Sequence, residues 1–368
     1  MLVKLQASHF AHSHRGVIDH AAIIGKEPRQ LVRSSKGTSY RIHEPTLAEY
    51  VRLTPRLVTP IYPSDANLIV SQLDIHVDTP FDPLRTEPPL EILEAGTGHG
   101  ALTLHLARAV HAANPPRPRP LPIAPQEEPE DAVYLGESMA DLEQTAAGTW
   151  RDNRRAIVHT LDISSKHSKH AKKIVGGFRG GMYSGSVDFH VGDASEWIAG
   201  QRATRQTEEP FLSHVLLDLP NADQHLTNVA QALHVNGMLA VFNPSITQIV
   251  DCVTAIREQK MPYLLDKVIE LGAGTIREWD VRAVKPRAST NKAKSQDSVE
   301  TDGGAVDPVE EQKARDDELA KNLSQAEEKW ATVCRPKAGQ QLVGGGFLGL
   351  WRRMEPPSPS QEPDSSSS

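Results

Sequence analysis

Cysteine is scarce in this chain: Cys252 and Cys334 are the two present among 368 residues. Neither belongs to a Cys-x-x-Cys pair, so the sequence argues against a disulfide framework and against a cysteine-based metal motif. This composition is typical of a reducing, intracellular compartment. It leaves open whether that compartment is the nucleus and cytoplasm or the mitochondrion.

Long apolar runs are also lacking, and no segment approaches the length of a membrane span. The sequence shows no Ser-His-Asp arrangement that would suggest hydrolysis. The 16 histidines are scattered. His167 and His170 stand at helical spacing but have no evident third ligand, so we expect no metal site.

The chain has no excess of positive charge, since its formal net charge is −7. Two segments depart from this average: residues 1–60 carry nine Lys/Arg against four Asp/Glu, and residues 151–180 carry eight against two. Such patches can receive phosphates, but each is equally well explained as a solvated helix face. Both interpretations stay open at this point.

The most informative stretch is Leu93–Gly100, with the sequence Leu-Glu-Ala-Gly-Thr-Gly-His-Gly. An apolar run leads into it, and a helical pattern of leucines follows. This order predicts a strand, a tight glycine-rich turn and a helix. An acid beside such a turn suits a cationic, hydroxyl-rich ligand such as S-adenosylmethionine. The glycine spacing also fits the dinucleotide pattern, so a nicotinamide-dependent oxidoreductase is an alternative.

Strands and helices alternate from residue 90 onward, which predicts a mostly parallel, Rossmann-like α/β sheet with helices on both faces. We expect a small β-rich N-terminal domain over residues 1–62. The expected catalytic domain comprises residues 63–285 and 341–353. Composition predicts a Pro-rich, acidic insertion at 114–154, a disordered charged insertion at 286–340 and a disordered tail at 354–368.

Acidic residues follow four successive predicted strands: Glu94, Asp162, Asp193 and Asp218. Ligands of parallel sheets bind outside the carboxyl ends of the strands. Asp162 is placed for ribose hydroxyls and Asp193 for an adenine amino group, although each acid alone could be a turn former or helix cap. The run Leu217–Pro220, with Asp218 at the end of a strand and Pro220 in the turn after it, best distinguishes a methyltransferase from a dehydrogenase.

Several separate motifs occur in an order that resembles the catalytic subunit of the tRNA (adenine-58-N1)-methyltransferases, which are class I S-adenosylmethionine-dependent enzymes. The motifs are Ile23–Lys26 (IIGK), Pro60–Asp65 (PIYPSD), Glu94–Gly98 (EAGTG), Leu217–Pro220 (LDLP), Phe242–Gln248 (FNPSITQ) and Gly346–Leu348 (GFL). The resemblance implies methyl transfer from S-adenosylmethionine to N1 of adenine 58 in the tRNA T-loop.

The resemblance also implies site residues. Donor binding would involve Ile61, Glu94, Gly96, Thr97, Gly98, His99, Gly100, Asp162, Asp193, Ala194 and Asp218. Acceptor binding would involve Leu217, Leu219, Pro220, Phe242, Pro244 and Gln248, with Asp218 as the catalytic residue facing the target adenine.

Some residues depart from the family pattern. His99 stands where the family has Ser, Asp162 where Glu is usual, and Asn221–Asp223 where an aromatic residue is usual. The family implies either a heterotetramer with a homologous non-catalytic subunit or a homotetramer. A non-catalytic tRNA-binding paralogue and a methyltransferase of another RNA, such as mRNA, are the alternatives.

Overall fold

The computed structural model describes residues 5–78, 87–116, 148–272, 279–284, 331–336 and 345–355. For residues 279–284 and 331–336 it describes the backbone. The chain divides into two compact units, residues 1–273 with 344–368 and residues 274–343. Each unit is described by itself below.

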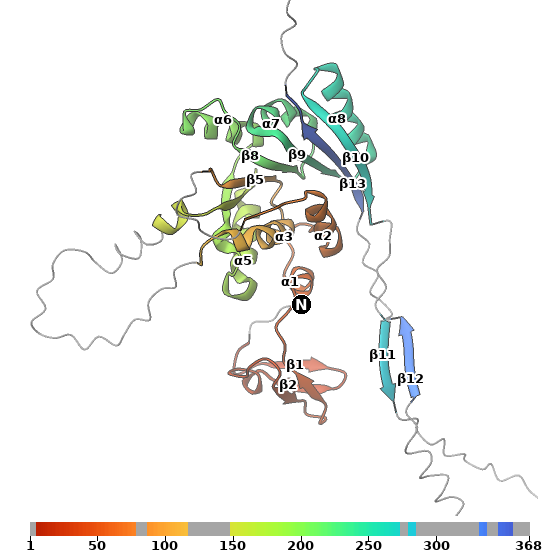
Figure 1. The fold of residues 1–368 in the computed structure, drawn as a ribbon. Helices are drawn as coiled ribbons and strands as arrows, with labels where there is room; N and C mark the ends of the chain where they lie inside the picture. Colours follow the sequence, from red (N-terminus) through yellow and green to blue (C-terminus); the bar gives the residue numbers. More distant parts are fainter. Residues whose placement is uncertain are drawn as a thin grey trace, which may run out of the picture. The chain divides into compact units, whose positions relative to one another are not determined.

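The first unit is built on a seven-stranded sheet (Figure 1). Its strands are β5 (Leu90–Ala95), β6 (Ala156–Asp162), β7 (Val187–Val191), β8 (Leu212–Leu217), β9 (Leu233–Asn243), β10 (Tyr263–Leu271) and β13 (Gly346–Arg353). Their order is β10-β13-β9-β8-β5-β6-β7. Strands β5 to β9 run parallel, whereas β13 pairs antiparallel with both β9 and β10. The predicted Rossmann-like fold class is confirmed.

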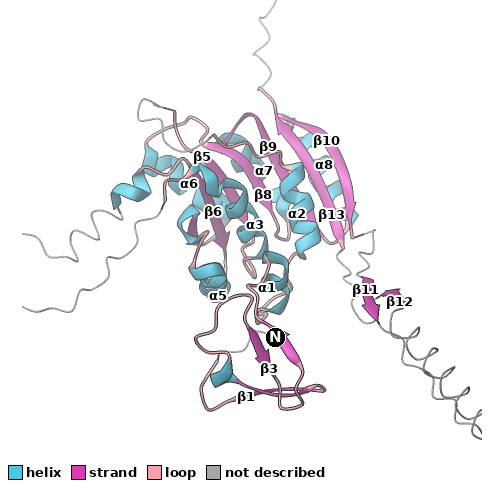
Figure 2. Ribbon diagram, turned by 60° about the horizontal axis from the view of Figure 1, so that its bottom comes forward, coloured by secondary structure: helices cyan, strands magenta, loops and turns pink. Residues whose placement is uncertain are grey.

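Helices cover both faces of this sheet (Figure 2). One buried cluster includes α1 (Leu47–Leu53), α2 (Pro63–Gln72), α3 (Ala101–Val110) and α5 (Ser165–Gly177). A second cluster includes α6 (Ala194–Arg205), α7 (Leu226–Ala232) and α8 (Ile246–Glu258). Successive side chains of a strand point to opposite faces, so Ile92 of β5 joins the first cluster and Leu93 the second.

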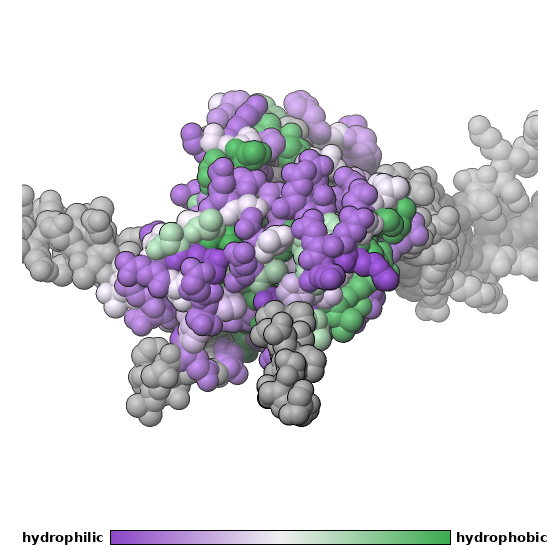
Figure 3. Space-filling model, turned by 90° about the horizontal axis from the view of Figure 1, so that it is seen from above, coloured by the Kyte–Doolittle hydropathy of each residue, from purple (hydrophilic) through white to green (hydrophobic). Residues whose placement is uncertain are grey.

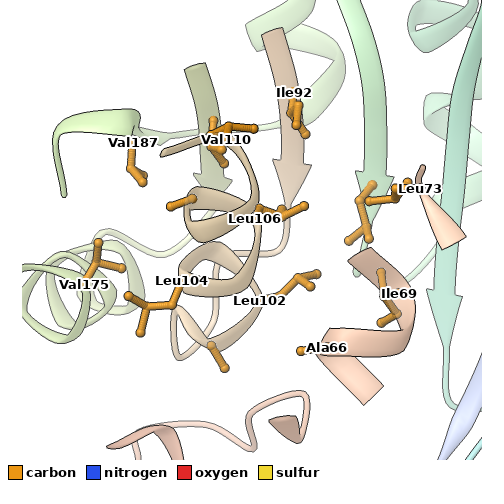
Figure 4. Close-up of a cluster of buried hydrophobic side chains, with 14 of the residues drawn as sticks. Ala66, Ile69, Leu73, Ile92, Leu102, Leu104, Leu106, Val110, Val175 and Val187 are labelled. Atoms are coloured by element: carbon orange, nitrogen blue, oxygen red, sulfur yellow. The ribbon is translucent and has the colours of Figure 1, made fainter. Parts of the chain in front are cut away.

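Helix α3 lies at the centre of the first cluster, in contact with both α2 and α5 (Figure 4). Leu102, Leu104 and Leu106 are all buried, so apolar side chains surround α3 on most sides. A helix that is apolar on most sides belongs in the interior. This packing fixes the glycine-rich turn, because the turn leads directly into α3.

The N-terminal residues form two β-hairpins. Strand β1 (Phe10–Ser13) pairs with β2 (Gly16–Asp19), and β3 (Leu31–Arg33) pairs with β4 (Ser39–Arg41). A short 3-10 helix, η1 (His20–Ala22), follows β2. These elements agree with a small β-rich region at the start of the chain.

Helix α1 is a correction to that expectation, since it lies within the range that we predicted to be β-rich. A capping box between Thr46 and Glu49 starts it, and this Thr-x-x-Glu pattern is a helix signal that we had not used. Leu47, Tyr50 and Val51 are buried in the first cluster, so α1 packs with the helices that follow.

The second unit contains an antiparallel pair, β11 (Trp279–Val284) with β12 (Ala331–Pro336). We expected disorder over 286–340; within that range the structure describes the backbone of β12 as a strand paired with β11. Most of that insertion lies outside the described residues. The same holds for residues 117–147 of the insertion at 114–154 and for residues 356–368 of the tail.

Hydrophilic side chains cover most of the face seen in Figure 3, with smaller hydrophobic patches among them. Within the described ranges, no helix is long and apolar enough to cross a membrane. The same residues contain no group of three or more His, Cys, Asp or Glu side chains that could hold a metal ion.

Candidate active site

The structure brings three of the predicted acids to neighbouring strand ends. Strand β5 lies between β6 and β8, so Glu94 at the end of β5 is flanked by Asp162 and Asp218. The backbone N–H of Asp218 donates to the carbonyl of Ala95 at 2.8 Å. The Gly96 N–H donates to the carbonyl of Leu161, also at 2.8 Å. These bonds hold the three strand ends in one arrangement.

Glu94 is almost completely buried, with 1% of its surface exposed. Two hydroxyls donate to its Oε2 atom, Thr103 Oγ1 at 2.5 Å and Thr160 Oγ1 at 2.7 Å. Burial raises the pKa of Glu94 to about 8, the hydroxyl donors lower it, and the charges of Asp218 and Asp162 raise it further. A desolvated acid of this kind ionises readily only when a cation lies beside it.

Sequence reasoning missed both threonines as site residues. Thr160 precedes Asp162 by two positions in β6, and Thr103 lies in the first turn of α3. The strand period places Thr160 on the same face as Asp162, a signal that could have identified it.

The glycine-rich turn depends most strongly on Gly96, whose φ is +106°. A Cβ atom at this position would lie 2.0 Å from the carbonyl oxygen of Asp218. Gly98 also has a positive φ and donates its N–H to Asp162 Oδ2 at 2.9 Å. Thr97 is buried, with its hydroxyl 2.7 Å from that of Thr160, and Gly100 caps α3. The backbone of the turn is therefore bonded directly to the predicted ribose acid.

Asp162 accepts a second backbone hydrogen bond, from Ser164 N–H to Oδ1 at 2.8 Å. His167 Nδ1 lies 3.5 Å from the same oxygen. The next residue, Ile163, is 80% exposed and is an apolar surface beside this acid. Such a surface suits the flat ring of a nucleoside. The sequence analysis did not identify Ile163 as a site residue, although an apolar residue directly after a strand-end acid was visible in the sequence.

Asp193 has the cap geometry that the sequence left open. Its Oδ1 accepts from Ser195 N–H at 2.8 Å and from Glu196 N–H at 3.2 Å, which starts α6. Its other oxygen, Oδ2, lies 3.9 Å from His225 Nε2. Ala194, the first residue of α6, is buried. Asp193 is thus a helix cap with one oxygen left for a further partner.

Asp218 follows β8 directly and is partly buried. Burial raises the pKa of its carboxyl to about 7, and the nearby charge of Asp162 raises it further. Near neutral pH this group can therefore change its charge in response to what binds beside it.

His99 extends from the turn into the protein, with 2% of its surface exposed. Its Nε2 lies 3.2 Å from Thr54 Oγ1, and its ring contacts that of His170 edge-on. Burial lowers the pKa of His99 to about 4, so the ring is neutral at pH 7. Among the described residues, its buried Nδ1 atom has no hydrogen-bond partner. His99 thus connects the turn with the segment after α1 and with α5.

The predicted acceptor residues differ widely in exposure. The side chains of Leu217 and Asp218 point to opposite faces of the sheet, because successive residues of a strand alternate. The Leu217 side chain is fully buried in the second cluster and fills the core. Leu219 and Phe242 are partly buried against the core. Pro220 and Pro244 are exposed, and Gln248 in α8 is partly exposed. Ile61, predicted for the donor, packs against the first cluster.

A family model described as the tRNA methyltransferase complex GCD14 subunit matches residues 154–349. The tRNA (adenine(58)-N(1))-methyltransferase TrmI of Thermus thermophilus is 30% identical over 271 residues, which are 74% of this chain and 79% of the relative. The chain belongs to the GCD14 tRNA methyltransferase family. A TrmI of Methanocaldococcus jannaschii, named for adenines 57 and 58, is 32% identical over 79 residues, or 22% of this chain and 24% of the relative.

Solved structures agree with the fold of this GCD14-family chain. A SAM-dependent O-methyltransferase of Thermotoga maritima has a TM-score of 0.56 at 16% identity, covering 98% of this chain and 90% of the other. The tRNA (m1A58) methyltransferase TrmI of Aquifex aeolicus has a TM-score of 0.51 at 15% identity, covering 96% and 92%. At these identities the likeness concerns the fold, and it supports a class I methyltransferase architecture.

The close approach at Gly96 leads to a first prediction. Gly96→Ala forces a Cβ against the Asp218 backbone, which we expect to cost about 1–3 kcal/mol for overpacking in addition to the strain of its positive φ. Gly98→Ala is the matched control, because its Cβ would meet Val58 at an ordinary 3.4 Å. Urea unfolding of both variants measures the difference. Equal losses would contradict this account of the turn.

Proposed function

We propose that this chain is the catalytic subunit that transfers a methyl group from S-adenosylmethionine to N1 of adenine 58 in the T-loop of tRNA, forming N1-methyladenosine. The observation that carries the proposal is the buried carboxyl of Glu94, held between Asp162 and Asp218 beside the glycine-rich turn. The desolvated acid cluster costs free energy in the ligand-free protein, and a bound cationic ligand offsets that cost. A non-catalytic paralogue would have no need to keep it.

The site fits the donor in several respects. Glu94 would face the α-ammonium group, and Asp162 would accept from the ribose hydroxyls. Ile163 would lie against the adenine ring, with Asp193 Oδ2 as an acceptor for its amino group. Gly96 holds the turn against the backbone of Asp218, where a Cβ would not fit, and the methionine end would lie beside this turn. When bound, the donor supplies an electrophilic methyl group, which the N1 lone pair attacks while the C–S bonding electrons stay on sulfur.

Asp218 would face the target adenine. Its carboxylate would accept a hydrogen bond from the exocyclic amine and so raise the electron density at N1. The same group would then take up the proton that methylation makes more acidic. A pKa of about 7 suits both roles near neutral pH, because ionised and protonated forms are both accessible.

The acceptor base would contact residues that flank Asp218. Leu219 and Pro220 follow it in the chain. Phe242 lies near the end of the adjacent strand β9, and Pro244 and Gln248 come after that strand. A T-loop adenine is stacked inside folded tRNA, so binding requires the base to be extruded. The chemistry itself needs positioning and electrostatics more than a strong base.

The family name describes a complex, and we propose that this chain works with further subunits. The partner would be either a homologous non-catalytic subunit in a heterotetramer or further copies of this chain in a homotetramer. An acidic chain binds tRNA more readily when a partner adds positive charge.

Methyl transfer from labelled S-adenosylmethionine to unmodified tRNA tests the function. We expect label in the wild-type transcript, together with a reverse-transcription stop at position 58. A transcript with guanine at position 58 should take up no label. The chain should be assayed alone and with its partner subunit. Donor binding without transfer to tRNA would point to another RNA acceptor, and absence of donor binding would overturn the enzyme assignment.

The role of Asp218 predicts a specific pattern of loss. Asp218→Asn keeps the shape of the side chain but cannot ionise, so we expect single-turnover transfer to fall by roughly 10² to 10⁴-fold. Donor affinity should change little. The wild-type rate should rise with pH through about 7 and then level off, and the variant should lose this rise. A parallel loss of donor binding would show that Asp218 holds the donor instead.

The pKa of Glu94 predicts proton release on donor binding. At pH 7 the free protein holds Glu94 mostly protonated, because its pKa is about 8. The donor's ammonium group favours the ionised form, so affinity should increase with pH up to about 8 and change little above it. Calorimetry in buffers of different ionisation enthalpy measures the proton.

The matched control for this prediction is Asp218→Asn, which should still release the proton, whereas Glu94→Gln should not. Proton release that persists in Glu94→Gln would assign the titration to another group.

A further inference from the structure

Four lysines lie on the solvent side of helix α5. The helix has the sequence Ser-Lys-His-Ser-Lys-His-Ala-Lys-Lys-Ile-Val-Gly-Gly and contains no acidic residue. Its buried residues are Ser168, Ala171, Ile174 and Val175. The exposed lysines are Lys166, Lys169, Lys172 and Lys173, which we call the α5 lysine stripe. Spacings of three and four place these lysines on the arc opposite the buried residues.

The α5 lysine stripe is unpaired within the described part of the chain, where none of its ammonium groups forms an ion pair with a carboxylate. Like charges three and four residues apart repel one another, and Lys166 stands in the first turn, where the helix dipole disfavours a cation. The stripe therefore works against the stability of its own helix.

Other basic residues of the same region have structural partners. Arg154 is buried and forms a two-pronged ion pair with Asp188. Arg155 donates to the backbone carbonyl of Glu87, and Arg179 lies 3.7 Å from Glu44. The predicted basic patch at 151–180 thus separates into residues with internal contacts, the exposed Arg151 and the α5 lysine stripe. The stripe is a continuous track of exposed charge that is available to an external anion.

Helix α5 is also next to the donor side of the site. Ser164, which accepts the first hydrogen bond of the helix, follows Asp162 by two residues. On the inner side of α5, His170 contacts His99 of the glycine-rich turn, and Tyr50 of α1 donates to the Ile174 carbonyl at 2.9 Å. The helix is thus attached to the rigid elements of the site, and its outer side faces solvent.

We propose that the α5 lysine stripe binds the phosphate backbone of the tRNA substrate beside the active site. This inference rests on the proposed function and assigns part of tRNA binding to a specific surface of this chain. Lysine presents a compact charge on a flexible stem and contacts phosphates without reading bases. A track of unpaired lysines on a fixed helix suits an A-form stem, which is recognised through its backbone. The stripe would position the RNA while other residues hold the extruded base.

The test replaces all four lysines of the stripe with glutamine in the full-length chain and measures tRNA binding over a range of salt concentrations. We expect the dissociation constant to rise by at least about tenfold at low salt. In a plot of the logarithm of the dissociation constant against the logarithm of the salt concentration, the slope should fall by about three to four. Donor affinity and the single-turnover rate at saturating tRNA should stay unchanged, and the thermal midpoint should stay equal or rise as self-repulsion is removed.

A matched pair of double variants controls for loss of charge in general. Lys169→Gln with Lys173→Gln should weaken tRNA binding, whereas Lys260→Gln with Lys267→Gln, two exposed lysines after α8 and in β10, should not. Equal losses in both pairs, or wild-type binding by the four-lysine variant, would overturn the proposal. Binding is measured separately from methyl transfer, so failure of the proposed function would appear as bound tRNA without transfer.

Discussion

The contact between Gly96 and the backbone of Asp218 is the constraint on which the site depends. Three parallel strands end side by side, and the chain leaving β8 must pass directly over the turn that leaves β5. No side chain fits between them, since a Cβ at Gly96 would lie 2.0 Å from the Asp218 carbonyl oxygen. This approach places a carboxyl group from β8 beside one from β5. The acids proposed for catalysis and for donor binding are therefore neighbours because of backbone packing rather than side-chain length.

Burial then gives these neighbouring acids different properties. Glu94 is enclosed, and burial raises its pKa to about 8 although two threonine hydroxyls donate to it and lower it. Asp218 is partly open, with a pKa of about 7. Asp162 instead accepts two backbone N–H groups, from Gly98 and Ser164. The three acids thus differ in burial and in hydrogen-bond partners, which matches the three different roles proposed for them.

The sequence predicted the sheet and the order of the acids, because strand and helix periods alternate clearly from residue 90 and each acid follows an apolar run. It also identified the glycines, although not that Gly96 matters for its contact with Asp218. The strand period could have identified Thr160. The roles of Thr103 and His225 depend on which elements lie side by side, and one sequence does not give that arrangement. Helix α1 and strand β12 were missed because the first is short and the second lies within a polar, charged segment. Leu217 was included with the acceptor residues because the motif around Asp218 was read without the alternation of the strand, which turns the Leu217 side chain into the core.

Strand β13 has a consequence for how the molecule is made. It pairs with β9 on one side and β10 on the other, although both of those strands precede it in the chain. During synthesis the ribosome produces β9 and β10 first, and they have no direct pairing with each other in the finished sheet. The edges of β9 and β10 that pair with β13 therefore stay unpaired until residues 346–353 have been synthesised. The sheet that supports these acids is therefore completed late in translation.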